Sequence, residues 1–461
     1  MRLPNNISEC HQLILVLMRQ IELQGEKNKE LEARLNQNSG NSSKPPSSDL
    51  HKPKRRRGIQ GKAKKKGGQK GHKGDTLKMV ATEKANEIKP LKPERCSCGQ
   101  RLLRQDMELH ARRQVFDIPD PQLVITEYEQ LACSCPNCGK YNIGQFPDLI
   151  KAPVQYGCGL RSLMVLLSVK CQLSEQNISE LFTDLFGYAV NSGTIQSTLN
   201  RAHQQSEPVA QQIKQAALAC SILNLDETGI QIENKRRWLH TISNEAWTWL
   251  HVHANRGHKA LQDNSPTLFD YQGVVVHDCW KPYWKLTLAH HALCNAHLLR
   301  ELNGLMEQGS EWAEKMHDLL LRLYQKHRKG KQIHRRSHEW RLYSQICQQA
   351  FEQEPPPIKK GREQPKKSKG RNLAERFDKY KEAVLRFALH PDIPFTNNQA
   401  ERDIRPVKGK LKVAGCFRTW KGAQRYARLQ SVFSTWKSSN TISSKNSKPF
   451  LTDPTFHLIS N

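Results

Sequence analysis

The stretch Ile222-Leu-Asn-Leu-Asp-Glu-Thr-Gly229 decides how the rest of this sequence is interpreted. Apolar residues precede two carboxylates and a glycine, which is typical of a short buried strand that ends at a tight turn. A second run of this kind, Val274-Val-Val-His-Asp278, also ends in an aspartate. A third acid, Glu401, lies in Thr396-Asn-Asn-Gln-Ala-Glu401, which begins like a helix capped by asparagine. We therefore predict two strand-end aspartates and one helical glutamate.

The elements predicted around these acids follow a definite order. Strands are predicted at Ile222–Asp226, Trp238–Ser243, Trp247–His253, Val274–His277 and Ala289–Cys294, and helices at 257–271 and Asn295–Met306. This multidomain α/β order, β-β-β-α-β-α-β-α, resembles that of a ribonuclease H-like core. The first and fourth strands are neighbours in that topology, so Asp226 and Asp278 can share one metal site.

The chain is strongly basic. Its 461 residues include 72 Lys and Arg against 44 Asp and Glu, which gives a net charge of +28. A charge of this size attracts polyanions at long range. Residues 51–74 contain 11 Lys and Arg and no acid, a composition that neutralises phosphates without reading base sequence. These features favour DNA as the partner, and Arg55, Arg56, Arg57, Lys64, Lys65 and Lys66 are the predicted contacts in this tract.

The cysteines point to metal binding rather than to disulfides. Five of the 13 cysteines fall between Cys96 and Cys138, and no secretory signal or long apolar run is found. We therefore predict a cytoplasmic protein with no membrane partner. Cys96-Ser-Cys98-Gly and Cys135-Pro-Asn-Cys138-Gly are predicted to hold one structural Zn²⁺ within a small β module, with strands at Arg113–Val124 and Leu131. Cys133 is an alternative fourth ligand, and buried free thiols are the alternative to zinc.

The remaining sequence divides into further regions. A coiled-coil helix is predicted over 1–36, with Ile14, Leu17, Ile21 and Leu31 at 4-3 spacing and Asn28 as a polar position in the apolar seam. The other predicted regions are a disordered basic linker (37–89), the zinc-binding module (90–145), a helix-turn-helix-like helical region that binds DNA (150–215), the catalytic domain (220–436) with a helical and Pro/Lys-rich insertion (311–372), and a loose tail (437–461).

Cutting a phosphodiester bond requires an in-line nucleophile and relief of charge at the phosphate, which two Mg²⁺ ions can supply. Mg²⁺ prefers oxygen ligands, so Asp226 is predicted to bridge both ions, with Asp278 holding one and Glu401 the other. Glu227, Asp392 and Asp403 are competing carboxylates. Two further alternatives are Cys294-Asn-Ala-His297 as a ligand pair, or as a buried cysteine and an inward-facing histidine, and His277 as a hydrogen-bonding neighbour of Asp278.

Basic residues follow Glu401 along the chain. Arg402, Arg405, Lys408, Lys410 and Arg418 are predicted to contact DNA. Trp420 and Tyr426 alternate with Lys421, Arg425 and Arg428, a pattern that suits contact with a DNA backbone combined with stacking on bases.

Several long motifs resemble those of bacterial insertion-sequence transposases of the family numbered sixty-six. The motifs are Leu-Asp-Glu-Thr (225–228), Val-His-Asp-Cys-Trp-Lys-Pro-Tyr (276–283), Cys-Asn-Ala-His-Leu-Leu-Arg-Glu-Leu (294–302), Pro-Phe-Thr-Asn-Asn-Gln-Ala-Glu-Arg-Asp-Ile-Arg-Pro-Val-Lys (394–408) and Gly-Cys-Phe-Arg-Thr (415–419). Asn-Ser-Ser-Lys-Pro-Pro-Ser-Ser-Asp (41–49) and Gly-Gly-Gln-Lys-Gly-His-Lys-Gly (67–74) resemble the N-terminal region of that family, and the cysteine pairs resemble its zinc-binding segment. The first pair is Cys-x-Cys where the family more usually has Cys-x-x-Cys.

The resemblance implies a DDE transposase, a nucleoid-associated bacterial enzyme. It cleaves the 3′ ends of its element and joins them to target DNA in a metal-dependent reaction. Carried over by position, the catalytic triad is Asp226, Asp278 and Glu401. The implied partners are terminal-repeat and target DNA, further copies of the chain in a paired-end complex, and accessory proteins from the same element. Alternative functions are a decayed transposase that only binds DNA and a nuclease without strand transfer.

Overall fold

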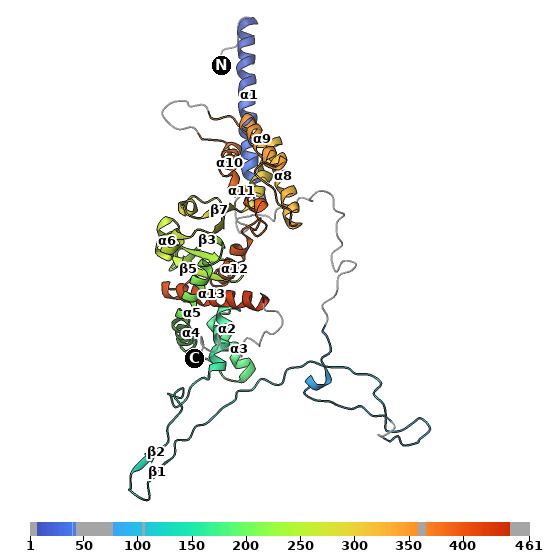
Figure 1. The fold of residues 1–461 in the computed structure, drawn as a ribbon, viewed down its shortest axis with the longest axis vertical. Helices are drawn as coiled ribbons and strands as arrows, with labels where there is room; N and C mark the ends of the chain where they lie inside the picture. Colours follow the sequence, from blue (N-terminus) through green and yellow to red (C-terminus); the bar gives the residue numbers. More distant parts are fainter. Residues whose placement is uncertain (1–6, 39, 43–76, 104–106, 358–365, 443–461) are drawn as a thin grey trace. The chain divides into compact units, whose positions relative to one another are not determined.

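The computed structural model describes residues 7–38, 40–42, 77–103, 107–357 and 366–442, drawn as coloured ribbon in Figure 1. Several predicted features lie outside these residues: the DNA contacts at Arg55–Arg57 and Lys64–Lys66, most of the basic linker, and residues 443–461 of the tail. The chain divides into two compact units, one of which is Arg55–Glu129. No helix among the described residues is long and apolar enough to cross a membrane.

A five-stranded mixed sheet forms the centre of the larger unit. Its strands are β3 (Ile222–Ile232), β4 (Lys235–Ser243), β5 (Thr248–His253), β6 (Val274–His277) and β7 (His290–Leu293), in the order β5-β4-β3-β6-β7. The three strands β5, β4 and β3 are antiparallel neighbours, whereas β6 and β7 add in parallel. The predicted pairing of the first and fourth strands is confirmed. The mixed α/β fold is consistent with a ribonuclease H-like core.

The register of β3 places the two aspartates at one end of the sheet. Pairing between β3 and β6 stops at Asn224 opposite Val276, so Asp226 and Asp278 follow two residues beyond this last pair. The predicted turn after Glu227 is wrong, because β3 continues to Ile232 in pairing with β4. The turn between β3 and β4 comes at Glu233 and Asn234, which both have positive φ, and this agrees with the turn that Glu233-Asn-Lys235 predicts between the first two strands.

One group of helices covers the sheet beside β3, β4 and β5. It consists of α2 (Cys158–Val169), α3 (Glu175–Phe186), α4 (Ser192–Gln205), α5 (Glu207–Leu218), α12 (Asn398–Ala414) and α13 (Trp420–Ile442). Figure 1 shows α2 to α5 gathered next to α13. Ser174 caps α3 and Gly187 ends it with φ +73°. The cap of α4 is Asn191, whose side chain accepts from Gly193 N.

A second group of helices packs beside β7. It consists of α7 (Asn295–Met306), α8 (Glu311–Arg328), α9 (His338–Gln353), α10 (Lys369–Lys379) and α11 (Lys381–Leu389), which share a separate apolar core that includes the fully buried Trp312. Helices α8 and α9, orange in Figure 1, lie within the predicted helical insertion (311–372). Helices α10 and α11 meet at Tyr380.

Three predicted elements differ from the structure. The helix predicted at 257–271 is α6 (His258–Asn264) followed by a 3₁₀ turn (Pro266–Asp270), because Pro266 cannot continue the α-helix. Between β6 and β7 the connection is a 3₁₀ turn (Lys281–Lys285) rather than an α-helix. The segment Arg113–Val124 forms no strand, and its Val115, Ile118 and Val124 are exposed because no neighbouring strand covers them.

Two smaller elements lie where the sequence predicts ordered structure, and one helix is longer than predicted. Helix α1 (Ile7–Leu35) corresponds to the helix predicted at the N-terminus. A short hairpin of β1 (Ala132–Ser134) and β2 (Tyr141–Ile143) encloses the second cysteine pair. Helix α13 extends to Ile442, so part of the predicted loose tail is helical.

Candidate active site

Asp226 and Asp278 are largely buried just beyond the point where β3 and β6 stop pairing, and Glu401 interacts with Asp226. Burial raises the pKa of Asp226 well above its usual range, and the negative charges of Glu227, Asp278 and Glu401 raise it further. Burial also raises the pKa of Asp278. Burial and neighbouring negative charges disfavour the ionised form of Asp226. A cation bound among these carboxylates would relieve that repulsion. The structure therefore brings Asp226, Asp278 and Glu401 close enough to interact electrostatically.

Glu401 reaches the site from the first turn of α12. Its carboxylate lies 3.8 Å from Nη2 of Arg300 and 3.9 Å from Nε2 of His297, both on α7. Burial and the charge of Arg300 lower the pKa of His297 to about 4, so the imidazole is neutral at pH 7. Arg300 therefore supplies the positive charge that faces Glu401.

The beginning of α12 is fastened to the sheet by Asn397. Its backbone amide donates to Sγ of Cys294 (3.1 Å), and its side-chain amide donates to the Leu225 carbonyl (2.8 Å). Its side-chain oxygen accepts from the Asn224 amide (2.9 Å). Asn397 thus occupies the expected cap position of α12, but its buried side chain bonds to β3 and makes no capping bond to the helix. One residue thus fixes the helix of Glu401 against the strand of Asp226.

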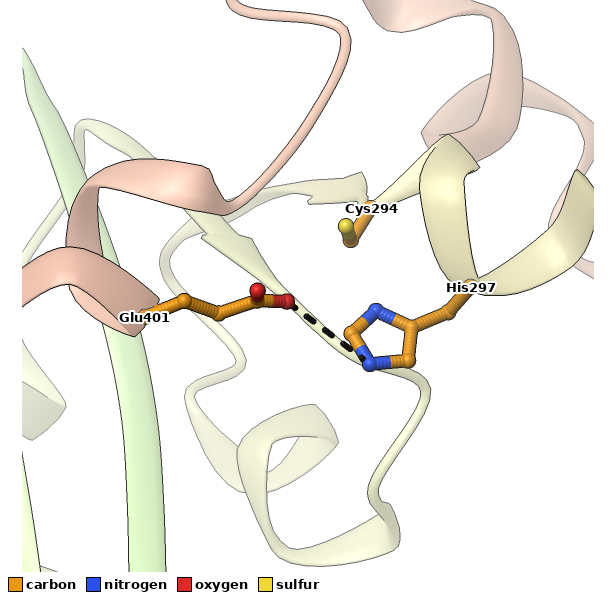
Figure 2. Close-up of side chains that lie close together, drawn as sticks. All are labelled: Cys294, His297 and Glu401. Atoms are coloured by element: carbon orange, nitrogen blue, oxygen red, sulfur yellow. Dashed lines mark ion pairs between the residues drawn. The ribbon is translucent and has the colours of Figure 1, made fainter. Parts of the chain in front are cut away.

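Cys294, His297 and Glu401 form the one group of three metal-ligating side chains found among the described residues. Their ligand atoms lie within 4.8 Å of one another (Figure 2). Cys294 is buried, which raises the pKa of its thiol to about 11, and its sulfur accepts a backbone hydrogen bond from α12. The buried cysteine agrees with the second interpretation of this motif, and the nearness of the three ligand atoms agrees with the first.

Glu227 differs from Asp226 although it is the next residue. Successive residues of a strand face opposite sides of the sheet. One Glu227 oxygen accepts from Nε (2.9 Å) and Nη2 (2.6 Å) of Arg256, and the other accepts from the Tyr283 hydroxyl (2.5 Å). Both carboxylate oxygens are thus engaged by the protein, which leaves Glu227 a poor competitor for a metal ion.

Other predicted competitors are placed away from the three acids or engaged elsewhere. Asp403 is buried on α12 and accepts a hydrogen bond from the side-chain amide of Gln399 (3.1 Å). Asp392 is exposed in the loop before α12. His277 is fully buried, and its Nε2 atom bonds to His291 Nδ1 (2.9 Å), so its ring is engaged inside the protein.

Basic residues on α12 differ in what they contact. Arg405 and Lys408 are exposed on the same helical face as Glu401, and Arg418 is exposed beyond the helix. Arg402 donates to Gln399 Oε1 (2.7 Å). Lys410 instead points toward the Leu173 carbonyl at 3.3 Å, and burial lowers its pKa.

The predicted stacking surface on α13 is wrong. Tyr426 is buried, so its ring cannot stack on a base. Arg425 donates to Asn200 Oδ1 (2.6 Å), and Arg428 donates to the His203 carbonyl (2.9 Å) and pairs with Glu207. These side chains hold α13 against α4 and α5, because α13 packs into the helical layer rather than facing solvent.

The two cysteine pairs lie in similar turns, one in each compact unit. Gly99 N donates to the Cys96 carbonyl (2.9 Å), and Gly139 N donates to the Cys135 carbonyl (2.9 Å). Both glycines have positive φ, +93° and +67°. Hydrogen bonds from the backbone of Cys98 lower the pKa of Cys96, and those from Cys138 and Asn137 lower the pKa of Cys135. Each pair thus has the backbone arrangement of a zinc knuckle, whereas Cys133 lies in β1 opposite Asn142.

Sequence reasoning missed Arg256 and Tyr283 as parts of this region, and it missed the bonds from Asn397 to β3. Tyr283 lies within the motif at 276–283, but its bond to Glu227 joins residues far apart in the chain. Arg256 follows β5 in a loop with no motif, so the sequence gives no local signal for its pairing.

Comparison with known families agrees with the motifs. A family model described as "Transposase IS66 family" matches residues 154–425, which is more than half of the chain and includes all three acids. A model for a family of unknown function (DUF6444) matches residues 3–78. A search of the curated proteins gives no match. The chain therefore belongs to the IS66 family of transposases, which implies a role in DNA transposition.

Proposed function

We propose that this transposase binds the ends of its element, cleaves their 3′ ends and joins them to target DNA, with Asp226, Asp278 and Glu401 as the catalytic metal ligands. The observation that supports this proposal is the raised pKa of Asp226, caused by burial and by the charges of its acidic neighbours. A cluster of carboxylates that disfavour one another's ionised form fits a divalent ion chemically.

Asp226 and Asp278 would hold the ions from adjacent strands, and Glu401 would complete the set from α12. Bound Mg²⁺ ions would supply charge relief at the phosphate and a more reactive attacking oxygen. Asn397 keeps α12 in register with β3, so the glutamate stays near the aspartates. Exposed Arg405 and Lys408 on the face of Glu401 would hold phosphates near these acids.

The test is strand cleavage and joining on labelled element-end DNA with Mg²⁺. We expect Asp226→Ala, Asp278→Ala and Glu401→Ala each to lower the rate by at least about a hundredfold. Asp392→Ala is the matched control, because Asp392 is an exposed acid outside the cluster. Wild-type protein that binds the ends but gives no product would favour a decayed copy that acts only in DNA binding. Cleavage without joining would favour a nuclease.

We also propose that the cysteine turns hold structural zinc. The turns at Cys96–Gly99 and Cys135–Gly139 present thiols with lowered pKa at Cys96 and Cys135, and zinc binds the thiolate form. Metal analysis of purified protein should give about one zinc per chain. Cys135→Ser should lose it, whereas Cys158→Ser, at an exposed cysteine outside the turns, should retain it. Folded wild-type protein free of zinc would contradict the proposal.

A further inference from the structure

Four side chains alternate between arginine and tryptophan beside Asp278. The Cζ atom of Arg236 lies 4.9 Å from the centre of the Trp238 ring, and Cζ of Arg256 lies 4.8 Å from the same ring. Arg256 also lies 4.6 Å from the Trp280 ring. We call Arg236, Trp238, Arg256 and Trp280 the Arg–Trp ladder. It joins β4, the loop after β5 and the segment after β6.

Arg256, the arginine between the two tryptophans, is held in place by Glu227. Glu227, with 1% of its side chain exposed, accepts two hydrogen bonds from Arg256, and Tyr283 holds the second oxygen of Glu227. Arg256 itself is 42% exposed. The bonds to Glu227 use Nε and Nη2, so Nη1 is left for another acceptor. An arginine held in this way is pre-organised to receive an anion at its open edge.

The outer arginine has room because of a glycine in the opening motif. Arg236 lies over Gly229, where a Cβ atom would come within 3.3 Å of the Arg236 Nε. Trp238 lies directly opposite Gly229 across the β3–β4 pair. Within the described part of the chain, no carboxylate forms an ion pair with Arg236, and the residue is exposed. The guanidinium therefore carries an uncompensated positive charge at the surface.

The inner end of the ladder meets the acidic cluster. The Trp280 backbone amide donates to Oδ1 of Asp278 (3.1 Å). Trp280 also contacts Tyr283 edge to face, with ring centres 5.2 Å apart. A polymer lying along the ladder would thus reach Asp278 at one end.

Arginine stacked on tryptophan also occurs as a purely stabilising surface contact, worth little at exposed sites. Three features favour a binding role instead. Three successive contacts join four alternating residues, the outer arginine has no acidic partner among the residues that the structure describes, and the series begins beside Asp278. Single-stranded nucleic acids are bound by this combination of cations for phosphates and aromatic rings for bases.

We propose that the Arg–Trp ladder binds a DNA strand beside Asp278, with the exposed Arg236 moving from the Trp238 ring onto a phosphate, Arg256 binding a second phosphate through its open edge, and Trp238 and Trp280 stacking on unpaired bases. The proposal rests on the proposed function in taking DNA as the ligand. The bound DNA strand would extend from Asp278 along the β3–β4 surface. None of the sequence motifs indicated this surface.

The first experiment compares neighbouring arginines on β4 in the full chain. Arg236 and Arg237 face opposite sides of the strand, and only Arg236 belongs to the ladder. The probe is a labelled mixed-sequence duplex with a single-stranded extension, bound without added metal so that no cleavage occurs. Arg236→Gln should lower the slope of log affinity against log salt by about one, whereas Arg237→Gln should leave it unchanged. Equal slopes for both variants would overturn the proposal.

The second experiment tests stacking and does not depend on total affinity. Trp238→Ala should weaken binding to the extension by roughly fivefold to a hundredfold, whereas Trp238→Phe should retain most of it. With bromodeoxyuridine in the extension, irradiation should crosslink the DNA to Trp238 and Trp280. Crosslinks that map only to other tryptophans would refute the ladder.

The outcomes separate this inference from the proposed function. Normal strand cleavage in wild type, combined with ladder variants that bind like wild type, would reject the ladder alone. Ladder-dependent binding by a protein that never cleaves element ends would support the ladder and reject the transposition chemistry.

Discussion

At the scale of single residues, adjacent carboxylates have different roles because they face different partners. Asp226 is surrounded by other acids, whereas Glu227 is bonded to Arg256 and Tyr283. The sequence predicts that Asp226 and Asp278 meet, because each follows an apolar strand. It does not predict the pairing of Glu227, since Arg256 lies in a later loop and the contact forms only when the hairpin and loop fold together.

A consequence for stability follows from the raised pKa of Asp226. Its folded-state pKa lies above the usual value, so the folded protein binds this proton more tightly than the unfolded chain does. The contribution to stability is therefore full below the unfolded pKa and is lost as the pH rises through the folded pKa. Above the unfolded pKa, the folded protein must either keep this carboxyl protonated or ionise it beside other acids, and both cost stability in the metal-free protein. A bound divalent cation should restore that stability.

We therefore predict that Asp226→Asn is more stable than wild type without metal at neutral pH, with a melting temperature roughly 2–4 °C higher. Addition of Mg²⁺ should raise the melting temperature of wild type but not of the variant. Thermal unfolding followed by circular dichroism at pH 7 and near pH 4 measures both effects, and the difference should shrink at the lower pH. An equal gain from Asp392→Asn, at an exposed site, would contradict this explanation.

At the scale of elements, strand and helix order follows from the sequence more reliably than the ends of each element. Alternating burial predicts the sheet, and Val274–His277 and Asn295–Met306 form with the predicted bounds. The end of β3 is missed because Gly229 was interpreted as a turn. In the structure it is a strand residue that leaves space for Arg236, a tertiary contact with no local signature.

The placement of α12 likewise depends on contacts between distant segments. Asn397 bonds to Leu225 and Asn224 on β3 and to Cys294 after β7. Its neighbour Asn398 is exposed at the first position of the helix. Sequence reasoning treated the two asparagines as equivalent caps, because only the folded structure distinguishes the buried one.

We predict that Asn397→Ala destabilises the fold by about 1–3 kcal/mol, because it leaves buried polar groups of β3 without partners. The same change should slow strand cleavage, since α12 carries Glu401. Asn398→Ala should change both properties little. Urea unfolding together with the cleavage assay measures the pair, and similar losses in the two variants would show that Asn397 has no special role.

At the scale of the whole molecule, the structure explains how the five-stranded sheet accommodates a long helical insertion. The helices α7 to α11 have their own apolar core, so the insertion between Asp278 and Glu401 need not disturb the sheet. The sequence predicts this insertion by its basic helices and Pro/Lys-rich segment. It does not predict that Asn41 contacts this region, where its side chain donates to Glu307 (2.6 Å) at the end of α7.

The N-terminal helix presents apolar residues that this single chain leaves uncovered. Ile14, Leu17 and Ile21 of α1 are 53%, 42% and 68% exposed, and they follow the 4-3 spacing of a coiled-coil seam. Burying such a seam removes apolar surface from water, which stabilises association. Bringing two element ends together also requires more than one protomer, so a second copy of the chain is the partner that fits.

We predict that deletion of residues 1–36 lowers the mass measured by light scattering at a given protein concentration. Ile21→Glu should have the same effect, because a charge in the seam cannot be buried without a partner. Gln20→Glu is the matched control, since it adds the same charge one position away from the seam on an exposed face of α1. A mass unchanged by the deletion would show that α1 is not the interface, and pairing of ends would then have to depend on another surface of the transposase.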